Sequence, residues 1–219
     1  MVEAMIRAVF FDLDGTLVDS EKHYTTGTKE WLERLGYHLS LEEVYPIIGK
    51  NMEETYAYLH EACGIPIEEA VRENEKYFDQ EHVIRYADYL FPDVRKTLDA
   101  CKEKGIRMAV CTGSQSSLLK MFLEDCDLEE YFEETVSSDQ HFPDKPDPAM
   151  YLYLLEKMGL EAEECLIVED SKNGILSGKR AGIYTVARDA SRYHVDQSEA
   201  DLIVKDLIEI MEVIDVRNH

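Results

Sequence analysis

The fold class is decided by the stretch Ile6-Arg7-Ala8-Val9-Phe10-Phe11-Asp12-Leu13-Asp14-Gly15-Thr16. Its first half, residues 6–11, is a short apolar run of the kind found in strands that are buried on both faces. The run stops at two acids, and Gly15 then allows the backbone to turn sharply. A buried strand that ends in polar residues at a turn predicts an open α/β sheet with a ligand site at its carboxyl edge.

Similar short apolar runs recur along the chain, at residues 106–111, 164–168, 183–187 and 201–204. Helical patterns alternate with them, at residues 91–104, 114–126, 147–158 and 171–181, and an amphipathic helix is expected after residue 206. Strands that alternate with helices of this length predict βαβ units with right-handed crossovers. We therefore expect an α/β fold with a Rossmann-like parallel sheet and helices on both of its faces.

The region from residue 20 to residue 85 has a different pattern and contains no convincing strand. Helical patterns cover residues 21–35, 52–62 and 66–85, and Ser40 with Glu43 forms a capping box that opens a further short helix. A helical block inserted directly after the first strand predicts a small second domain. We expect a core domain of residues 1–18 and 88–219 and an all-helical cap domain of residues 19–87.

Composition narrows the class of partner. The chain has 219 residues with 46 acidic and 23 basic side chains, a formal charge of −23, which disfavours nucleic acids and anionic membranes. An odd set of five cysteines without a CxxC pair fits neither a disulfide framework nor a zinc cluster. No stretch reaches the ~18–20 apolar residues of a membrane helix, and the early apolar run is not a signal peptide. We expect a cytoplasmic protein, either a monomer or a small homo-oligomer.

Asp12 and Asp14 are the strongest candidates for chemistry. Two carboxylates at the end of one strand repel each other unless a cation or a proton compensates. In such a pair one carboxylate can attack phosphorus while the other moves a proton. The alternative is an acidic turn, because Asp-Gly is common in turns.

A second polar segment, residues 112–116, follows the strand at residues 106–111. Thr112, Gly113 and Ser114 stand at the start of a helix, where backbone N–H groups and hydroxyls form anion sites. The alternative is an ordinary helix cap by Ser114 or Ser116.

Two more segments add a base and a second pair of acids. Pro146 and Pro148 stiffen the loop that carries Lys145, which suits a lysine that neutralises a phosphate, although an exposed lysine in a turn is the alternative. Glu169 and Asp170 end the strand at residues 164–168 and are hard oxygen ligands of the kind that hold Mg²⁺, with helix capping as the alternative. Acids, hydroxyls, a lysine and acids at strand ends form a set that fits phosphoryl transfer.

The chain resembles the haloacid dehalogenase superfamily, whose four signatures stand here in order as Asp12-x-Asp14-Gly15-Thr16, Thr112-Gly113-Ser114, Lys145-Pro146-Asp147-Pro148 and Glu169-Asp170-Ser171. The resemblance covers nearly the whole chain, including the helical insert. It is strongest to the subfamily of beta-phosphoglucomutases and small sugar-phosphate phosphatases.

The resemblance implies a role for each signature. Asp12 would attack phosphorus and form an aspartyl phosphate, and Asp14 would protonate the leaving oxygen and then activate water. Thr112 or Ser114 would hold the phosphoryl group, and Lys145 would screen its charge.

The remaining signature residues would bind the metal and the substrate. Asp170 with Glu169 would bind Mg²⁺ beside Asp12 and the backbone carbonyl of Asp14. Thr16 and Gly113 would complete the phosphate site.

The helical region departs from the mutase pattern in two places. Beta-phosphoglucomutases resemble one another in a motif Gly-x-x-Arg-x-x-Ser, and Met52 stands here where the Arg would be. Lys50 is a substitute cation, but it lacks the fork of a guanidinium. Mutases also tend to place a His twelve residues after the nucleophile, where this chain has Tyr24, with His23 one step earlier. His23 either lines the cleft or lies on the surface.

These departures favour a magnesium-dependent phosphatase that hydrolyses a small phosphate monoester, with a beta-phosphoglucomutase-type phosphomutase as the alternative. A dehalogenase is disfavoured by the second acid and the metal acids. A carbon–phosphorus bond hydrolase would need a Schiff-base lysine, and nothing singles one out among Lys22, Lys29 and Lys50. A non-catalytic protein that keeps the fold is a further alternative, but the nucleophile, the lysine and the metal acids are all present.

Overall fold

The computed structural model of the chain describes residues 4–48, 50 and 52–219. Six strands form one sheet in the order β3-β2-β1-β4-β5-β6, and every neighbouring pair is parallel. The strands are β1 (Ala8–Phe11), β2 (Arg107–Cys111), β3 (Glu134–Val136), β4 (Cys165–Glu169), β5 (Tyr184–Arg188) and β6 (Leu202–Val204). The predicted α/β fold with a Rossmann-like parallel sheet is confirmed.

β1 is a central strand of the sheet, which places its carboxyl end beside those of two neighbours. Its four residues are all buried, as expected for a strand that is covered on both faces. Phe11 pairs with Val110 of β2 on one side and with Val168 of β4 on the other. The segments that follow β1, β2 and β4 therefore meet at one edge of the sheet.

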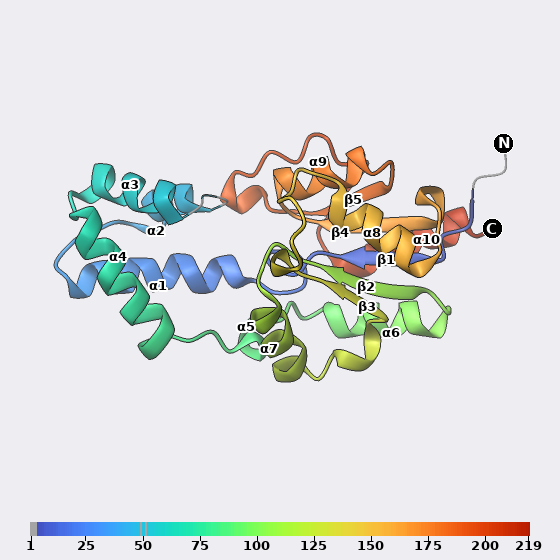
Figure 1. Cartoon of the computed structure of the whole chain (residues 1–219), viewed down its shortest axis with the longest axis horizontal. Coiled ribbons are helices and arrows are strands. Elements are labelled where there is room, and N and C mark those ends of the chain that lie inside the picture. Colours follow the sequence, from blue (N-terminus) through green and yellow to red (C-terminus); the bar gives the residue numbers. More distant parts are fainter. Residues whose placement is uncertain (1–3, 49, 51) are drawn as a thin grey trace. The chain divides into compact units, whose positions relative to one another are not determined.

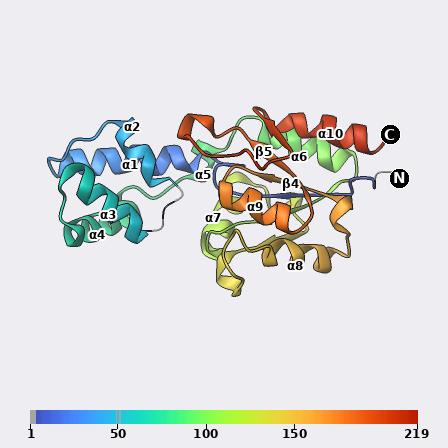
Figure 2. The same ribbon diagram turned by 90° about the horizontal axis from the view of Figure 1, so that it is seen from above.

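Helices cover both faces of the sheet, as Figure 1 and Figure 2 show for α6 and α8. The sulfur atoms of Cys101 in α6 and Met211 in α10 lie 3.8 Å apart, which places these two helices together. On the other face, α8 buries Met150, Tyr151 and Leu154 against strand residues. The helices of this part of the chain are α5 (Tyr86–Tyr89), α6 (Val94–Glu103), α7 (Ser116–Cys126), α8 (Ala149–Met158), α9 (Lys172–Arg180) and α10 (Ile210–Arg217).

β3 was not predicted from the sequence. It is three residues long, it pairs only with β2 in the sheet order, and two of its residues, Glu134 and Thr135, are only half-buried. Such a short edge strand has no apolar run to mark it. The other expected strands are present with bounds shifted by one or two residues.

The chain divides into two compact units, residues 1–19 with 86–219 and residues 20–85. We call them the core unit and the helical unit. The predicted domain boundaries, at residues 18–19 and 87–88, stay a prediction, because a division by contacts does not establish that either part folds alone. None of the helices in the described ranges is long and apolar enough to cross a membrane. All five cysteines lie in those ranges and are free.

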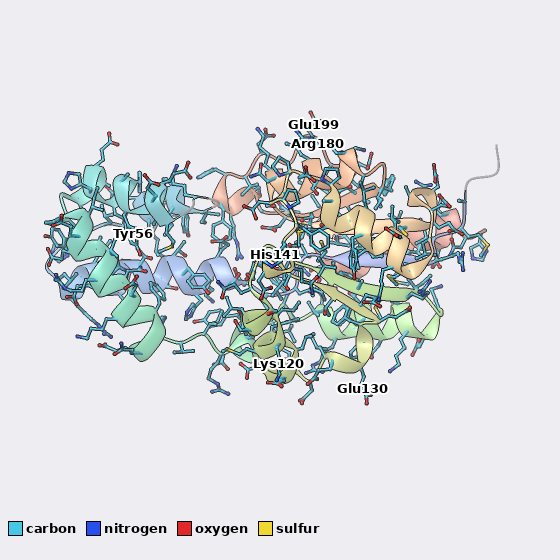
Figure 3. The ribbon with its side chains drawn as sticks, viewed as in Figure 1. Tyr56, Lys120, Glu130, His141, Arg180 and Glu199 are labelled. Carbon is cyan, nitrogen blue, oxygen red and sulfur yellow. The ribbon has the colours of Figure 1, made fainter. Side chains whose placement is uncertain are left out.

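The helical unit has a core of its own. Its helices are α1 (Ser20–Arg34), α2 (Leu41–Val44), α3 (Met52–Cys63) and α4 (Ile67–Lys76). Trp31, Leu32 and Leu59 are almost completely buried among them. Tyr56, which is labelled in Figure 3, is buried in the same cluster and donates a hydrogen bond to Asn74. The capping box of Ser40 and Glu43 is confirmed.

The single helix expected over residues 66–85 is wrong. α4 ends at Lys76, and one π-helical turn, Tyr77–Glu81, follows it. His82 then leaves the helical conformation, with φ −133° and ψ 49°. Phe78 packs edge to face on the ring of His23 in α1, and His82 stacks on the same ring, so tertiary packing overrides a sequence that favours helix throughout.

Candidate active site

Asp12 is fixed by the sheet itself. Its N–H donates to the carbonyl of Val168 at 2.9 Å, so it continues the ladder between β1 and β4, and the residue is 7% exposed. The chain then turns sharply: Gly15 has φ +79°, and its N–H donates to the carbonyl of Val18 at 2.8 Å. The turn leaves Asp12 at the carboxyl edge of the sheet, where the sequence predicts it.

Gly15 is required for more than its backbone conformation. A Cβ atom at this position would overlap the carboxylate of Asp170. Glycine is therefore the residue that lets the turn after β1 and the turn after β4 approach each other. Thr16 is fully buried, and its hydroxyl donates to Asp170 Oδ1 at 3.5 Å. Its hydroxyl thus supports an acid of the site and offers no exposed atom to a substrate in this structure.

Lys145 links three segments of the site. Its Nζ lies 2.6 Å from Asp12 Oδ1 and 2.6 Å from Glu169 Oε1, and it donates to the carbonyl of Cys111 at 2.9 Å. The side chain is 9% exposed, so the alternative of an exposed lysine in a turn is wrong. Burial by itself lowers the pKa of Lys145, but the carboxylates of Asp12 and Glu169 outweigh burial and raise it. Lys145 is therefore a fixed, charged group at the nucleophile candidate.

Glu169 is completely buried, and each of its carboxylate oxygens accepts two hydrogen bonds. Oε1 accepts from Lys145 and from the hydroxyl of Tyr151, which lies at 2.9 Å. Oε2 accepts from the N–H of Asp170 at 3.3 Å and from the hydroxyl of Ser171 at 3.2 Å. These donors fix the position of the Glu169 carboxylate, which in turn holds Lys145 in place.

Three acids of the site lie close together. Asp12, Glu169 and Asp170 offer oxygens within 4.8 Å of one another, and all three are buried. In the described part of the chain, Lys145 contacts two of these acids, Asp12 and Glu169. Burial raises the pKa of Asp12, and the charge of Glu169 raises it further. Carboxylate oxygens are the ligands that Mg²⁺ and other hard divalent cations prefer, so these three acids form a candidate metal site.

The polar segment after β2 joins the same edge. The N–H of Ser114 donates to Thr112 Oγ1 at 3.0 Å, and the hydroxyl of Ser114 donates to Asp14 Oδ2 at 2.7 Å. Asp14 is thereby held by the neighbouring strand's loop. A Cβ atom added to Gly113 would meet nothing within 4 Å among the described residues, so space is open beside this turn. The expectation that Ser114 or Ser116 caps the next helix is wrong, because Gln115 is the N-cap residue.

The two candidates in the helical unit lie in different surroundings. His23 is 2% exposed on α1, and its ring stacks on His82 with centroids 4.5 Å apart, so a surface His is the wrong interpretation. Burial, and then the charge of His82, lowers the pKa of His23 to about 4. Lys50 is exposed and lines a cavity of about 370 Å³ together with Tyr24 and Met52. Gly49 and Asn51, which belong to the motif compared with the mutases, lie outside the described residues.

Sequence reasoning missed three residues that shape this site. Tyr151 was indistinguishable from core tyrosines, and only the fold shows its hydroxyl on Glu169. A Cβ atom at Gly174 of α9 would overlap the Glu169 carboxylate, which explains a glycine in the first turn of a helix. Asp139 accepts from Ser116 at the start of α7, across 23 residues of sequence. A glycine three residues into a helix was the one local signal available.

The fold and the site together define a class. A parallel sheet with acids after its central strand, a buried lysine, a hydroxyl-bearing turn and a second acid pair is the arrangement of a hydrolase that works on phosphate groups. A family model described as "Haloacid dehalogenase-like hydrolase" matches residues 9–188. The chain belongs to this family, and within its superfamily it is a phosphatase of the subfamily that carries a helical insert.

Individual relatives are consistent with this assignment. The chain is 36% identical to the phosphoglycolate phosphatase of Aquifex aeolicus, over 82% of this chain and 83% of that protein. It is 32% identical to a "Phosphorylated carbohydrates phosphatase" of Thermotoga maritima, over 81% of this chain and 82% of that protein. A solved structure of a subfamily IA hydrolase from Geobacter sulfurreducens covers 95% of this chain and 96% of its own, with a TM-score of 0.74 and 26% identity.

Proposed function

We propose that this protein hydrolyses a small phosphate monoester with Mg²⁺ through an aspartyl phosphate on Asp12. The contact that carries the proposal is that of Lys145 Nζ with Asp12 Oδ1 at 2.6 Å, inside a buried acidic cluster. Burial raises the pKa of Asp12, and Lys145 acts against this rise and would neutralise charge that arrives with the phosphoryl group.

The first half of the reaction uses both acids after β1. A carboxylate oxygen of Asp12 forms a bond to phosphorus while the bond from phosphorus to the ester oxygen breaks. Asp14 gives a proton to the leaving oxygen, which departs as an alcohol. The hydroxyl of Ser114 lies 2.7 Å from Asp14 Oδ2 and keeps this side chain directed at the site. Thr112 and Gly113 line the turn that would receive the phosphoryl oxygens.

The second half restores the enzyme. Asp14, now ionised, takes a proton from water as the water oxygen bonds to phosphorus. The bond from phosphorus to Asp12 breaks, inorganic phosphate forms and the Asp12 carboxylate is regenerated. Lys145 stays bound to Glu169 at 2.6 Å through both halves and so remains a fixed positive charge.

Mg²⁺ is the proposed metal. Asp12, Asp170 and the backbone carbonyl of Asp14 would hold it, with Glu169 behind them, because four donors already occupy the Glu169 oxygens. When bound, the ion would neutralise the charge on the phosphoryl oxygens. Thr16 would act on Asp170 rather than on substrate, which replaces the substrate contact expected from the sequence.

The leaving group is proposed to be a small hydroxy acid or a sugar. The relatives named for phosphoglycolate and for phosphorylated carbohydrates support this range. Met52 in place of an Arg removes a cationic fork that a bisphosphate would need, which supports hydrolysis over phosphomutase chemistry. Lys50 remains the proposed substrate contact on the helical unit, and a contact from His23 would require its ring to leave the stack with His82.

One plate-based assay tests the proposal. Phosphate release is measured from 2-phosphoglycolate, several sugar phosphates and nucleoside monophosphates, each with Mg²⁺ and with EDTA, alongside conversion of beta-glucose 1-phosphate to glucose 6-phosphate. We expect phosphate release that needs Mg²⁺ and is fastest on one of the small esters. Isomerisation without net phosphate release would show a mutase instead, and inactivity on every ester would remove the proposal.

A further inference from the structure

The start of α7 is held by a residue from another loop. α7 has Gln115 as its N-cap, and within the described chain the Gln115 side chain makes no capping hydrogen bond. The N–H of Ser116 instead donates to Asp139 Oδ1 at 3.1 Å, and the Ser116 hydroxyl donates to Asp139 Oδ2 at 2.6 Å. A carboxylate at a helix N-terminus satisfies an amide that would otherwise lack a partner and favours the helix dipole.

Asp139 belongs to a short turn that directly follows β3. This turn, Ser138–Gln140, is a 3₁₀-helix, and the Ser137 hydroxyl donates to Asp139 Oδ1 at 2.7 Å. Asp139 therefore accepts three hydrogen bonds, two from Ser116 and one from Ser137. These bonds lower the pKa of Asp139 to about 2, so the side chain is ionised throughout the neutral range. His141, labelled in Figure 3, follows the turn in the chain.

The turn Ser138–Gln140 also contacts the segment of residues 112–116 at a second point. The N–H of Ser138 donates to the carbonyl of Ser114 at 3.1 Å, two residues before the contact of Ser116 with Asp139. The N–H of Thr112 donates to the carbonyl of Val136 at 2.9 Å. The segment from Thr112 to Ser116 is thus tied to the end of β3 and the turn after it by four hydrogen bonds.

We propose that Asp139 is a positioning residue that fixes the Thr112–Ser114 turn in the conformation that receives the phosphoryl group. This inference rests on the proposed function. Asp139 also uses the first amide of α7, and the N–H groups of Thr112 and Ser114 donate within the protein, so the Thr112 hydroxyl and the Gly113 N–H are the donors proposed to receive the phosphate. Without the Asp139 carboxylate, Ser116 would lose its two hydrogen bonds, and the neighbouring Ser114 would be held less firmly. The Ser114 hydroxyl would then no longer fix the side chain of Asp14.

The inference predicts a specific pattern of losses. Asp139→Ala removes all three acceptor contacts, and we expect kcat/KM for the best ester to fall about 30-fold and the affinity for inorganic phosphate about 10-fold, as for groups that misplace a reactive segment. Asp139→Asn keeps one acceptor oxygen and should lie between wild type and Asp139→Ala. The Mg²⁺ concentration for half activity should stay within about 2-fold, because Asp12 and Asp170 are supported by other contacts.

A matched control separates positioning from loss of a cap. Glu161 caps the short turn Ala162–Glu164 before β4, at the opposite edge of the sheet. Glu161→Ala removes an acidic cap without touching the site, so its phosphate affinity and kcat/KM should equal those of wild type. If both variants lost activity in proportion to their melting temperatures, Asp139 would be a structural cap only, and the inference would be overturned.

The experiment measures binding of inorganic phosphate by calorimetry, and turnover separately. Wild type that binds phosphate but turns over no ester would remove the proposed function while still allowing Asp139 to be judged by binding. Asp139→Ala that binds phosphate as wild type does would overturn the inference and leave the proposed function intact. Wild type that fails to bind phosphate would overturn both.

Discussion

The core unit and the helical unit differ in what fixes the position of their functional side chains. In the core unit, Asp12 follows β1, Thr112 follows β2 and Glu169 ends β4, and these strands are neighbours in a parallel sheet. In the helical unit, Lys50 lies between helices, beside residues outside the described part of the chain. A site at strand ends is determined by topology, whereas a pocket between helices depends on packing that local sequence does not encode. The reaction class is therefore far easier to infer than the substrate.

The largest effect is expected from a substitution of the nucleophile in the core unit. Asp12→Asn removes the nucleophile while keeping the shape of the side chain, and we expect turnover to fall by at least about 1,000-fold. Phosphate release at saturating Mg²⁺ measures the loss, and circular dichroism checks that the fold is kept. Asp215→Asn, on the exposed surface of α10, is the control and should keep full activity. Turnover retained by Asp12→Asn in a clean preparation would rule out the aspartyl-phosphate route.

Gly174→Ala tests whether close packing, as well as motif identity, builds the core site. The added methyl overlaps the Glu169 carboxylate, so Glu169 and the Lys145 it holds must shift. We expect kcat to fall about 10- to 100-fold, as for a displaced catalytic group. Gly178→Ala is the matched control, because it crowds Thr185 from the same helix, away from the acids. Equal losses of kcat in the two variants would mean that α9 acts through stability alone.

The same residues show how far sequence reasoning reaches. Asp12, Lys145, Glu169 and Asp170 were found because each follows a recognisable strand or stands in a stiff loop. β3 was missed because a three-residue edge strand with two polar residues is too short to show the apolar pattern of a strand. Tyr151 and Asp139 were missed because their partners are distant in sequence, and only the assembled sheet brings them together. The π-helical turn after α4 was missed because ring contacts of Phe78 and His82 with His23, which is distant in sequence, override helix propensity.

Tyr151→Phe tests a single hydrogen bond of the core site, and a smaller effect is expected. The ring stays and the hydroxyl that donates to Glu169 is lost, which leaves that carboxylate with three of its four donors. We expect kcat/KM to fall about 3- to 10-fold, because the loss of one of four donors only loosens the Glu169 side chain. Steady-state kinetics measure the change. Tyr153→Phe, on the same helix and only partly buried, should have no effect, and an unchanged Tyr151→Phe would show that Glu169 does not need this donor.

The helical unit has a predicted pH response of its own, which comes from His23. His23 has a folded pKa of about 4 against an ordinary value near 6.5, so the unfolded chain binds the proton more readily. Stability is therefore fully present above about pH 6.5 and falls as the pH drops toward 4. We expect the melting temperature to fall by a few °C more between pH 7 and pH 5 in wild type than in His23→Phe.

The control for this prediction lies in the same unit. His38 is exposed, so His38→Phe should keep the wild-type pH response. Thermal melts of the three proteins at both pH values make the comparison. A His23→Phe variant with the same pH dependence as wild type would show that the stack of His23 on His82 does not control the stability of the helical unit.

The most direct test of the account is chemical trapping of the covalent intermediate. Enzyme turning over its best ester with Mg²⁺ is quenched and treated with sodium borohydride, which reduces an acyl phosphate on aspartate to homoserine, and the peptide with residue 12 is sequenced by mass spectrometry. We predict homoserine at position 12 in wild type, none in Asp12→Asn, and none when EDTA replaces Mg²⁺. Robust turnover with unmodified Asp12, or a phosphoryl group trapped on Ser114 or another residue, would contradict the account.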